Sequence, residues 1–218
     1  MGSKASPQAL RIKINQSWKS LWFGRAGFGK NLVEDIALRR KLIADFRNAS
    51  ISDVLINRNA NQIEVNIHTA RPGVLIGRGG TGSEKIKKLV EKSTGMKARV
   101  NIVEVKLPDI DAMYIAQSIA SQIEKRIPFR RAVKQLLERA KDSGAKGVKI
   151  QVSGRLNGAE IARSEKFANG TVPLSTFDSV IDYAYVTALT TYGIIGIKVW
   201  VYKGRTADMN KDKKSFRK

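Results

Sequence analysis

The chain contains 218 residues, a length that accommodates one large domain or two small ones. Its 40 Lys and Arg residues against 19 Asp and Glu give a formal net charge of +21, and 42% of the residues are hydrophobic, enough for a packed core. Such a charge on a foldable chain is typical of nucleic-acid-binding proteins, because Lys and Arg beside phosphates release condensed counterions. Cysteine is absent and His68 is the single histidine, which excludes disulfides and thiolate metal sites and nearly excludes structural zinc.

No apolar stretch in the first 30 residues is longer than Leu21–Phe23, and no run approaches the ~20 apolar residues of a membrane span. We therefore expect a cytoplasmic protein with no membrane partner. His68 falls on the polar side of a predicted strand and has no constellation of catalytic partners, so it is interpreted as a surface residue. The sequence predicts no metal, no cofactor and no small-molecule substrate.

Residues 1–30 carry six cations and no acidic residue, and their apolar spacing is irregular. We expect an extended basic arm here, anchored by its aromatic side chains. Its candidate RNA-binding residues are Lys4, Arg11, Lys13, Trp18 and Trp22.

Residues 31–108 show the periodicities of a first domain. Apolar residues predict a helix over 31–46, with Leu32, Ile36, Ile43 and Phe46 on its apolar stripe. Alternation predicts strands over 51–56 and 63–68. A short helix, a glycine loop at 77–82, a helix from about 83 to 94 and a strand over 98–105 follow.

Residues 109–203 predict a second domain of two helices packed on a mostly antiparallel four-stranded sheet, so that the whole chain is α+β. The first helix has a buried stripe of Ala112, Ile115, Ala116, Ile119, Ala120 and Ile123, and the second has Val133, Leu136, Leu137 and Ala140. Asp111 is expected to cap the first helix, and Asn157-Gly158 and Asn169-Gly170 signal turns between strands. Residues 204–218 form a basic tail with almost no apolar residues, expected to be disordered.

Two glycine patterns resemble nucleotide-binding motifs. Gly24–Asn31 matches a P-loop except that Asn31 replaces the hydroxyl residue that ligates magnesium. Gly77, Gly79 and Gly82 satisfy the dinucleotide pattern, but Arg71-Pro72-Gly73 separates them from the preceding strand. Two consecutive helices after the next strand also break the strand–helix alternation of a dinucleotide-binding fold.

The same region contains a third pattern, Gly77-Arg78-Gly79-Gly80, which is a G-x-x-G loop between two predicted helices. A KH module uses such a loop because its glycines let a nucleic-acid backbone approach closely while a basic residue meets phosphate. A helix and strand in front of the β-α-α-β core are typical of the type II order, so residues 31–108 are interpreted as a type II KH domain.

Three further stretches carry a family resemblance. They are Ser153–Arg163, Gly170–Leu174 and Thr190–Gly193 with Gly196–Trp200, and they follow an N-terminal Met1–Lys4 and Trp22-Phe23 pattern. Over about residues 1–203 the chain resembles the bacterial small-subunit ribosomal protein three family. The resemblance implies a non-enzymatic protein of the subunit head that binds small-subunit ribosomal RNA and lines the messenger RNA entry channel. It also implies small-subunit ribosomal proteins ten and fourteen as neighbours.

The resemblance assigns Arg130, Arg131 and Lys134 to gripping and helping to unwind messenger RNA. At ~100° per residue these cations adjoin the predicted apolar face of their helix. The alternative is a solvated charged face without RNA contact. Arg155 and Arg163 either bind ribosomal RNA phosphate or pair with Glu160 and Glu165.

Two rival functions belong to other classes. A nucleotide-dependent enzyme would use one of the glycine loops, and a free-standing KH regulator would prefer a short single-stranded sequence. The basic arm at 1–30 and the basic tail favour the ribosomal interpretation.

Overall fold

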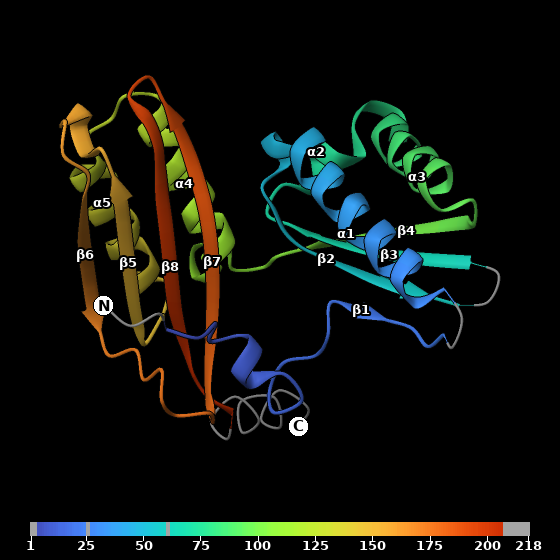
Figure 1. The fold of residues 1–218 in the computed structure, drawn as a ribbon, viewed down its shortest axis with the longest axis horizontal. Coiled ribbons are helices and arrows are strands. Elements are labelled where there is room, and N and C mark those ends of the chain that lie inside the picture. Colours follow the sequence, from blue (N-terminus) through green and yellow to red (C-terminus); the bar gives the residue numbers. More distant parts are fainter. Residues whose placement is uncertain (1–3, 25–26, 60–61, 207–218) are drawn as a thin grey trace. The chain divides into compact units, whose positions relative to one another are not determined.

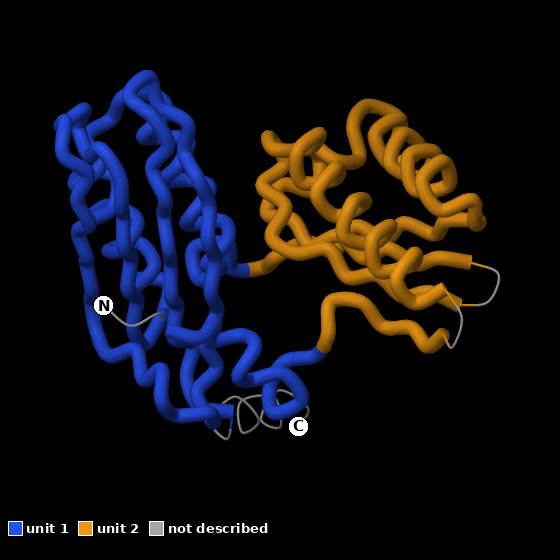
Figure 2. The backbone as a smooth tube through the Cα atoms, in the orientation of Figure 1, with its two compact units in different colours: residues 1–17, 107–218 blue, residues 18–106 orange. Residues whose placement is uncertain are grey.

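The computed structural model describes residues 4–24, 27–59 and 62–206. The chain divides into two compact units, one made of residues 18–106 and the other of residues 1–17 together with 107–218 (Figure 2). The units divide between residues 106 and 107, whereas the sequence predicts the end of the first domain at residue 108. The expected separate arm does not appear as a unit of its own, because its two parts join different units.

The unit of residues 18–106 has the predicted order of helix, two strands, short helix, glycine loop, helix and strand. Its elements are β1 (Ser20–Leu21), α1 (Phe28–Asp45), β2 (Ile51–Arg58), β3 (Gln62–Thr69), α2 (Pro72–Ile76), α3 (Thr81–Thr94) and β4 (Lys97–Glu104). The sheet order is β1-β2-β3-β4, with β2 and β3 antiparallel and the outer pairings parallel. Alternate residues of β2 and β3 pack with Leu38 and Leu42 of α1 and Ile86 and Val90 of α3 in one core.

The predicted apolar face of α1 is correct only in its second half, where Ile43 and Phe46 pack against the core. Leu32 and Ile36 are 39% and 38% exposed, whereas Asp35, Leu38 and Leu42 are buried. A polar network turns this helix: the carboxylate of Asp35 accepts hydrogen bonds from Nε of Arg58 at 2.8 Å and Nε1 of Trp22 at 2.9 Å. The spacing of apolar residues alone cannot predict such a buried ion pair.

The second unit contains α4 (Ala112–Glu124), α5 (Phe129–Asp142), β5 (Gly147–Gly154), β6 (Arg163–Gly170), β7 (Ser179–Thr190) and β8 (Gly193–Arg205). The sheet order is β6-β5-β8-β7 and every pairing is antiparallel. Figure 1 shows α4 and α5 on one side of this sheet. The predicted stripes of both helices are buried in the core, and Asp111 caps α4 by accepting from the N–H groups of Met113 and Tyr114.

The connections between strands differ from the predicted turns. Residues 155–162 form a longer loop between β5 and β6, with Asn157 and Gly158 in a short 3-10 turn. The tight hairpin lies instead at Thr191-Tyr192, between the paired residues Thr190 of β7 and Gly193 of β8. Strand β8 continues to Arg205, beyond the expected start of the tail at 204, while residues 207–218 lie outside the described part of the chain.

The N-terminal segment is packed against the rest of the second unit, and Arg11 anchors it there rather than the aromatic side chains expected from the sequence. Arg11 is fully buried, and its guanidinium donates to the backbone carbonyls of Pro7, Leu174, Thr176 and Ser179 at 2.8–3.0 Å. The side-chain amides of Gln8 and Gln16 donate to carbonyls of β7, an edge strand. Edge strands present unpaired backbone groups, so this segment covers part of that edge.

Candidate nucleic-acid interface

The G-x-x-G loop joins α2 to α3 at the surface of the first unit. Gly77, Gly79 and Gly80 have φ values of 67°, 63° and 79°, a region that side chains with a Cβ rarely adopt. Arg78 is exposed within the loop. The loop leads into the N-terminus of α3, where the first backbone N–H groups lack helical partners and the helix dipole favours an anion. This arrangement suits contact with a phosphate backbone.

Neither nucleotide-binding alternative has the required structural context. A dinucleotide loop directly follows a buried strand, whereas Gly77 follows the helix α2. A P-loop lies between a strand and a helix, yet Gly29 and Lys30 are already inside α1. Arg25 and Ala26 of the same motif lie outside the described residues.

The second candidate surface lies on α5. Arg130, Arg131 and Lys134 are exposed, while Val133 and Leu136 on the adjoining face are buried in the core. This bears out the expected geometry of one packed face beside one cationic face. Among the described residues, the side chains of Arg131 and Lys134 have no ion pair or hydrogen bond, so their charges face solvent.

Arg130 differs from these two cations because it pairs with a carboxylate. Its Nε lies 3.1 Å from Oε2 of Glu165, and its Nη2 lies 3.0 Å from Oε1. The hydrogen bond from Arg130, together with the charges of Arg130 and Arg163, lowers the pKa of Glu165 below its ordinary value. Glu165 therefore holds the Arg130 guanidinium in one orientation.

The structure shows intramolecular contacts for both Arg155 and Arg163. Nε of Arg163 lies 3.2 Å from Oε1 of Glu165, so Arg163 makes one of the ion pairs considered for it. Nε of Arg155 donates to the carbonyl of Ala159 at 2.9 Å, within its own loop, and no pair with Glu160 is found between these described side chains. The Arg155 guanidinium also lies 5.9 Å from the ring centroid of Tyr192.

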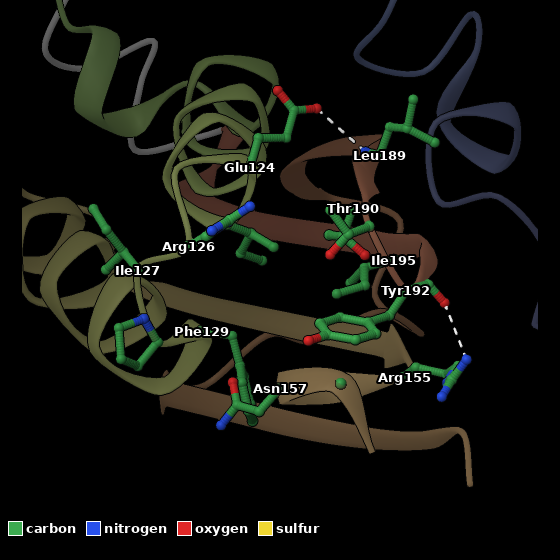
Figure 3. A pocket seen from close by; sticks show the side chains of 14 residues that line it. Glu124, Arg126, Ile127, Phe129, Arg155, Asn157, Leu189, Thr190, Tyr192 and Ile195 are labelled. Atoms are coloured by element: carbon green, nitrogen blue, oxygen red, sulfur yellow. Dashed lines mark hydrogen bonds between the residues drawn. The ribbon is translucent and has the colours of Figure 1, made fainter. Parts of the chain in front are cut away.

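A cavity of about 750 Å³ opens beside the start of α5, where the α4–α5 turn meets the β5–β6 loop and the β7–β8 hairpin (Figure 3). Pro128 and Phe129, which directly precede Arg130, form part of its wall. Arg126, Arg155 and Tyr192 also line it. Arg155 was expected near RNA, but Arg126 and Tyr192 were not singled out as site residues.

The five candidates of the N-terminal segment have different environments. Lys4 and Lys13 are exposed on the second unit, and Trp18 is 53% exposed on the first. Trp22 is half-buried, with its N–H bound to Asp35 and its ring 5.1 Å from that of Phe28. The expected RNA contact of Arg11 conflicts with its burial, because all of its bound carbonyls belong to the chain itself.

Two findings concern the metal-binding and membrane-spanning classes of protein. Within residues 4–24, 27–59 and 62–206, His, Asp and Glu side chains do not gather in groups of three or more that would hold a metal ion. The helices of the same residues include none that is long and apolar enough to cross a membrane.

The first unit has a glycine loop between two helices beside a mixed sheet, and the second α+β unit has an exposed cationic helix. Together these features define an RNA-binding protein with a KH domain. Family models agree: residues 37–110 match the KH domain, and residues 119–201 match the ribosomal protein S3, C-terminal domain. Curated relatives named small ribosomal subunit protein uS3 extend the similarity to nearly the whole chain. The relative from Carboxydothermus hydrogenoformans is 50% identical over 94% of this chain and 92% of its own.

Two more relatives of the same name come from Ligilactobacillus salivarius and Bacillus cytotoxicus. They are 45% and 47% identical, and each comparison covers 97% of this chain and at least 96% of the relative. The chain belongs to the small ribosomal subunit protein uS3 family. This membership confirms the family resemblance and agrees with the expectation that the chain is not an enzyme.

Proposed function

We propose that this protein is a structural component of the small ribosomal subunit in the cytoplasm, where it binds ribosomal RNA and contacts incoming messenger RNA. Membership of the uS3 family supports the ribosomal role. The observation that carries the messenger role is the exposed row of Arg130, Arg131 and Lys134 on a helix whose other face is buried. By resemblance, small-subunit ribosomal proteins ten and fourteen are its neighbours.

The proposed messenger contact is electrostatic. Arg131 and Lys134 offer two solvent-facing charges, and Glu165 holds Arg130 beside them. Phosphate contacts position a nucleic acid without reading its sequence, which suits a surface that every messenger passes. Contacts between exposed cations and phosphates are weakened by solvent and salt. Each cation can therefore release one phosphate and bind the next as the messenger moves. We infer that the row grips incoming messenger and assists its positioning and unwinding.

Ribosomal RNA is assigned to the G-x-x-G loop and to the exposed cations of the N-terminal segment. The backbone of Gly77, Gly79 and Gly80 and the side chain of Arg78 provide close approach and charge at the start of α3. Lys4, Lys13 and Trp18 present further exposed contacts. Arg163 contributes through the exposed part of its ion pair with Glu165, whereas Arg11 and Trp22 act as anchors within their units.

The messenger role is tested with ribosomes that carry the charge reversals Arg130→Glu, Arg131→Glu and Lys134→Glu together. We expect nearly normal subunit assembly and slower progress through messengers with stable hairpins, measured as elongation rate against unstructured messengers. Arg139→Glu is a matched control for Arg131→Glu, because both residues are exposed arginines of α5. Equal hairpin passage by the triple variant and the unaltered protein would contradict the assignment.

The loop is tested separately by changing Gly79 and Gly80 to Asp, which adds negative charge where we place phosphate. Crosslinking between this loop and RNA should fall strongly. Gly95→Asp serves as the control, since Gly95 has a similar φ of 67° at the opposite end of α3. Unchanged crosslinking in the double variant would contradict a phosphate contact at Gly79 and Gly80.

A further inference from the structure

The cavity beside α5 brings together stretches that are far apart in the sequence. Its wall includes Phe129 at the start of α5, Arg155, Asn157 and Gly158 in the β5–β6 loop, and Thr190–Tyr192 at the β7–β8 hairpin. Its volume of about 750 Å³ lies within the ~300–1,000 Å³ range of sites that hold small ligands. The proposed messenger contacts use the neighbouring cations of α5 but leave this cavity without a role.

The lining combines an apolar floor with an aromatic ring. Ile123, Ile127 and Ile195 provide apolar surface, and Tyr192 remains 58% exposed. Figure 3 shows the Tyr192 side chain reaching into the cavity, with its hydroxyl directed away from Arg155. An exposed aromatic ring over an apolar floor is a stacking partner for an unpaired base, whatever the identity of that base.

The position of the Tyr192 ring is fixed by its neighbours. A Cβ placed on Gly158 would lie 3.0 Å from Cε2 of Tyr192, so the loop backbone packs directly against the ring. The Arg155 guanidinium lies 5.9 Å from the ring centroid, and its Nη1 donates to the Tyr192 carbonyl at 3.4 Å. The ring therefore needs little rearrangement to receive a base, which reduces the entropy lost on binding.

The charge at the rim suits a phosphate. Arg126 is exposed, has a positive φ of 63°, and makes no hydrogen bond or ion pair through its guanidinium within the described residues. Glu124 is the acidic residue of the lining, and its Oε1 accepts a hydrogen bond from the N–H of Leu189. The cavity thus has two arginines against one engaged carboxylate.

We propose that this cavity holds a single unstacked nucleotide of the messenger, with its base stacked on Tyr192 and its phosphate bound by Arg126. The proposal rests on the messenger role proposed above, because Phe129 joins the cavity wall to Arg130 along the chain. Stacking here is independent of base identity and so remains compatible with any messenger. Stacking on Tyr192 would separate one base from its neighbours, which the phosphate contacts of α5 alone do not do.

The first experiment uses ribosomes programmed with messengers that carry thiouridine at successive downstream positions. Near-ultraviolet light should crosslink one position to the peptide that contains Tyr192. We expect Tyr192→Phe to keep the crosslink and Tyr192→Ala to reduce messenger retention and crosslinking about tenfold, within the ~5- to 150-fold range for losing one stacked base. Tyr185→Ala is the control, since Tyr185 is a similarly exposed tyrosine of β7.

Arg126→Ala provides a second variant, which should not change the stability of the fold because this exposed side chain has no partner within the described residues. It should weaken messenger retention and flatten its salt dependence, while Arg126→Lys restores both. If the triple α5 variant loses messenger contact but the Tyr192 and Arg126 variants do not, the cavity proposal falls and the messenger role stands. If none of them changes contact, both fall.

Two other outcomes would also overturn the proposal. Crosslinks from Tyr192 to ribosomal RNA would show that the nucleotide comes from the subunit itself. A protein side chain in the cavity, detected as a protein–protein crosslink in assembled subunits, would show that the site is a contact between neighbours.

Discussion

Arg130 on α5 and Glu165 on β6 form a two-point ion pair, in which Nε and Nη2 of the arginine lie 3.1 Å and 3.0 Å from the two carboxylate oxygens. The pair joins a cation assigned to messenger RNA to an acidic residue of the same unit. We therefore expect Glu165 to affect RNA binding in two ways: it orients the guanidinium and it competes with phosphate for it.

Replacing Glu165 with Gln removes the competing charge but keeps the size of the side chain. We expect RNA affinity at moderate salt to rise, and the slope of log affinity against log salt to steepen by ~0.7, the value for one more phosphate contact to a single strand. Affinity titrations at several salt concentrations would check this. An unchanged slope would mean that Arg130 does not reach phosphate.

The same pair predicts the acid titration of Glu165. Its pKa is lowered first by the hydrogen bond from Arg130 and then by the charges of Arg130 and Arg163. A group with a lowered folded-state pKa stabilises the fold above its unfolded pKa, near ~4.3 for Glu, and loses that contribution as the pH falls through the folded value. Carboxyl NMR should place the Glu165 midpoint below ~4.3, and Arg130→Ala should move it upward.

Asp35 should be among the most sensitive positions of the first unit. Its side chain and that of Arg58 are 1% and 5% exposed, so Asp35→Ala removes a buried carboxylate that accepts from Nε of Arg58 and from the Trp22 N–H. Because Arg58 keeps its ion pair with Glu34, we expect a loss of about 3 kcal/mol in the free energy of unfolding, the lower end of the range for a broken buried pair, measured by urea denaturation. Asp53→Ala breaks an exposed pair with Lys19 and should cost at most ~1 kcal/mol.

Arg11 should stabilise the second unit although it lies at the other end of the chain. Arg11→Ala removes the guanidinium that donates to the carbonyls of Leu174, Thr176 and Ser179, and we expect a loss of about 2–4 kcal/mol. Hydrogen exchange should rise in residues 174–183. Lys13→Ala, at an exposed neighbouring cation, is the control, and equal effects of both changes would refute the anchoring role.

The parts of the fold that were predictable from sequence depend on local periodicity. The stripes of α4 and α5 consist of apolar residues at helical spacing, and all of them are buried as expected. The orientation of α1 depends instead on the ion pair between Asp35 and Arg58, which are 23 residues apart. From their residue types, both Asp35 and Arg58 are predicted to lie at the surface, because Asp and Arg are rarely buried without a partner.

The candidate site shows the same limit. The cationic face of α5 follows from the spacing of Arg130, Arg131 and Lys134 within one helix. The pairing of Arg130 with Glu165, and the approach of Tyr192 to Gly158, each join residues more than 30 positions apart. Such contacts follow from the pairing of strands and the length of loops, which no local pattern specifies.

The packing of Arg11 sets an order for folding during synthesis. Leu174, Thr176 and Ser179, which supply carbonyls for its guanidinium, leave the translating ribosome 163–168 residues after it. At ~5–20 residues per second that delay lasts roughly 8–30 s, while all strands of residues 18–106 are already complete. The first residues to be made are thus among the last to reach their final place, and a nascent chain that stalls before residue 174 keeps its basic N-terminal segment accessible to RNA.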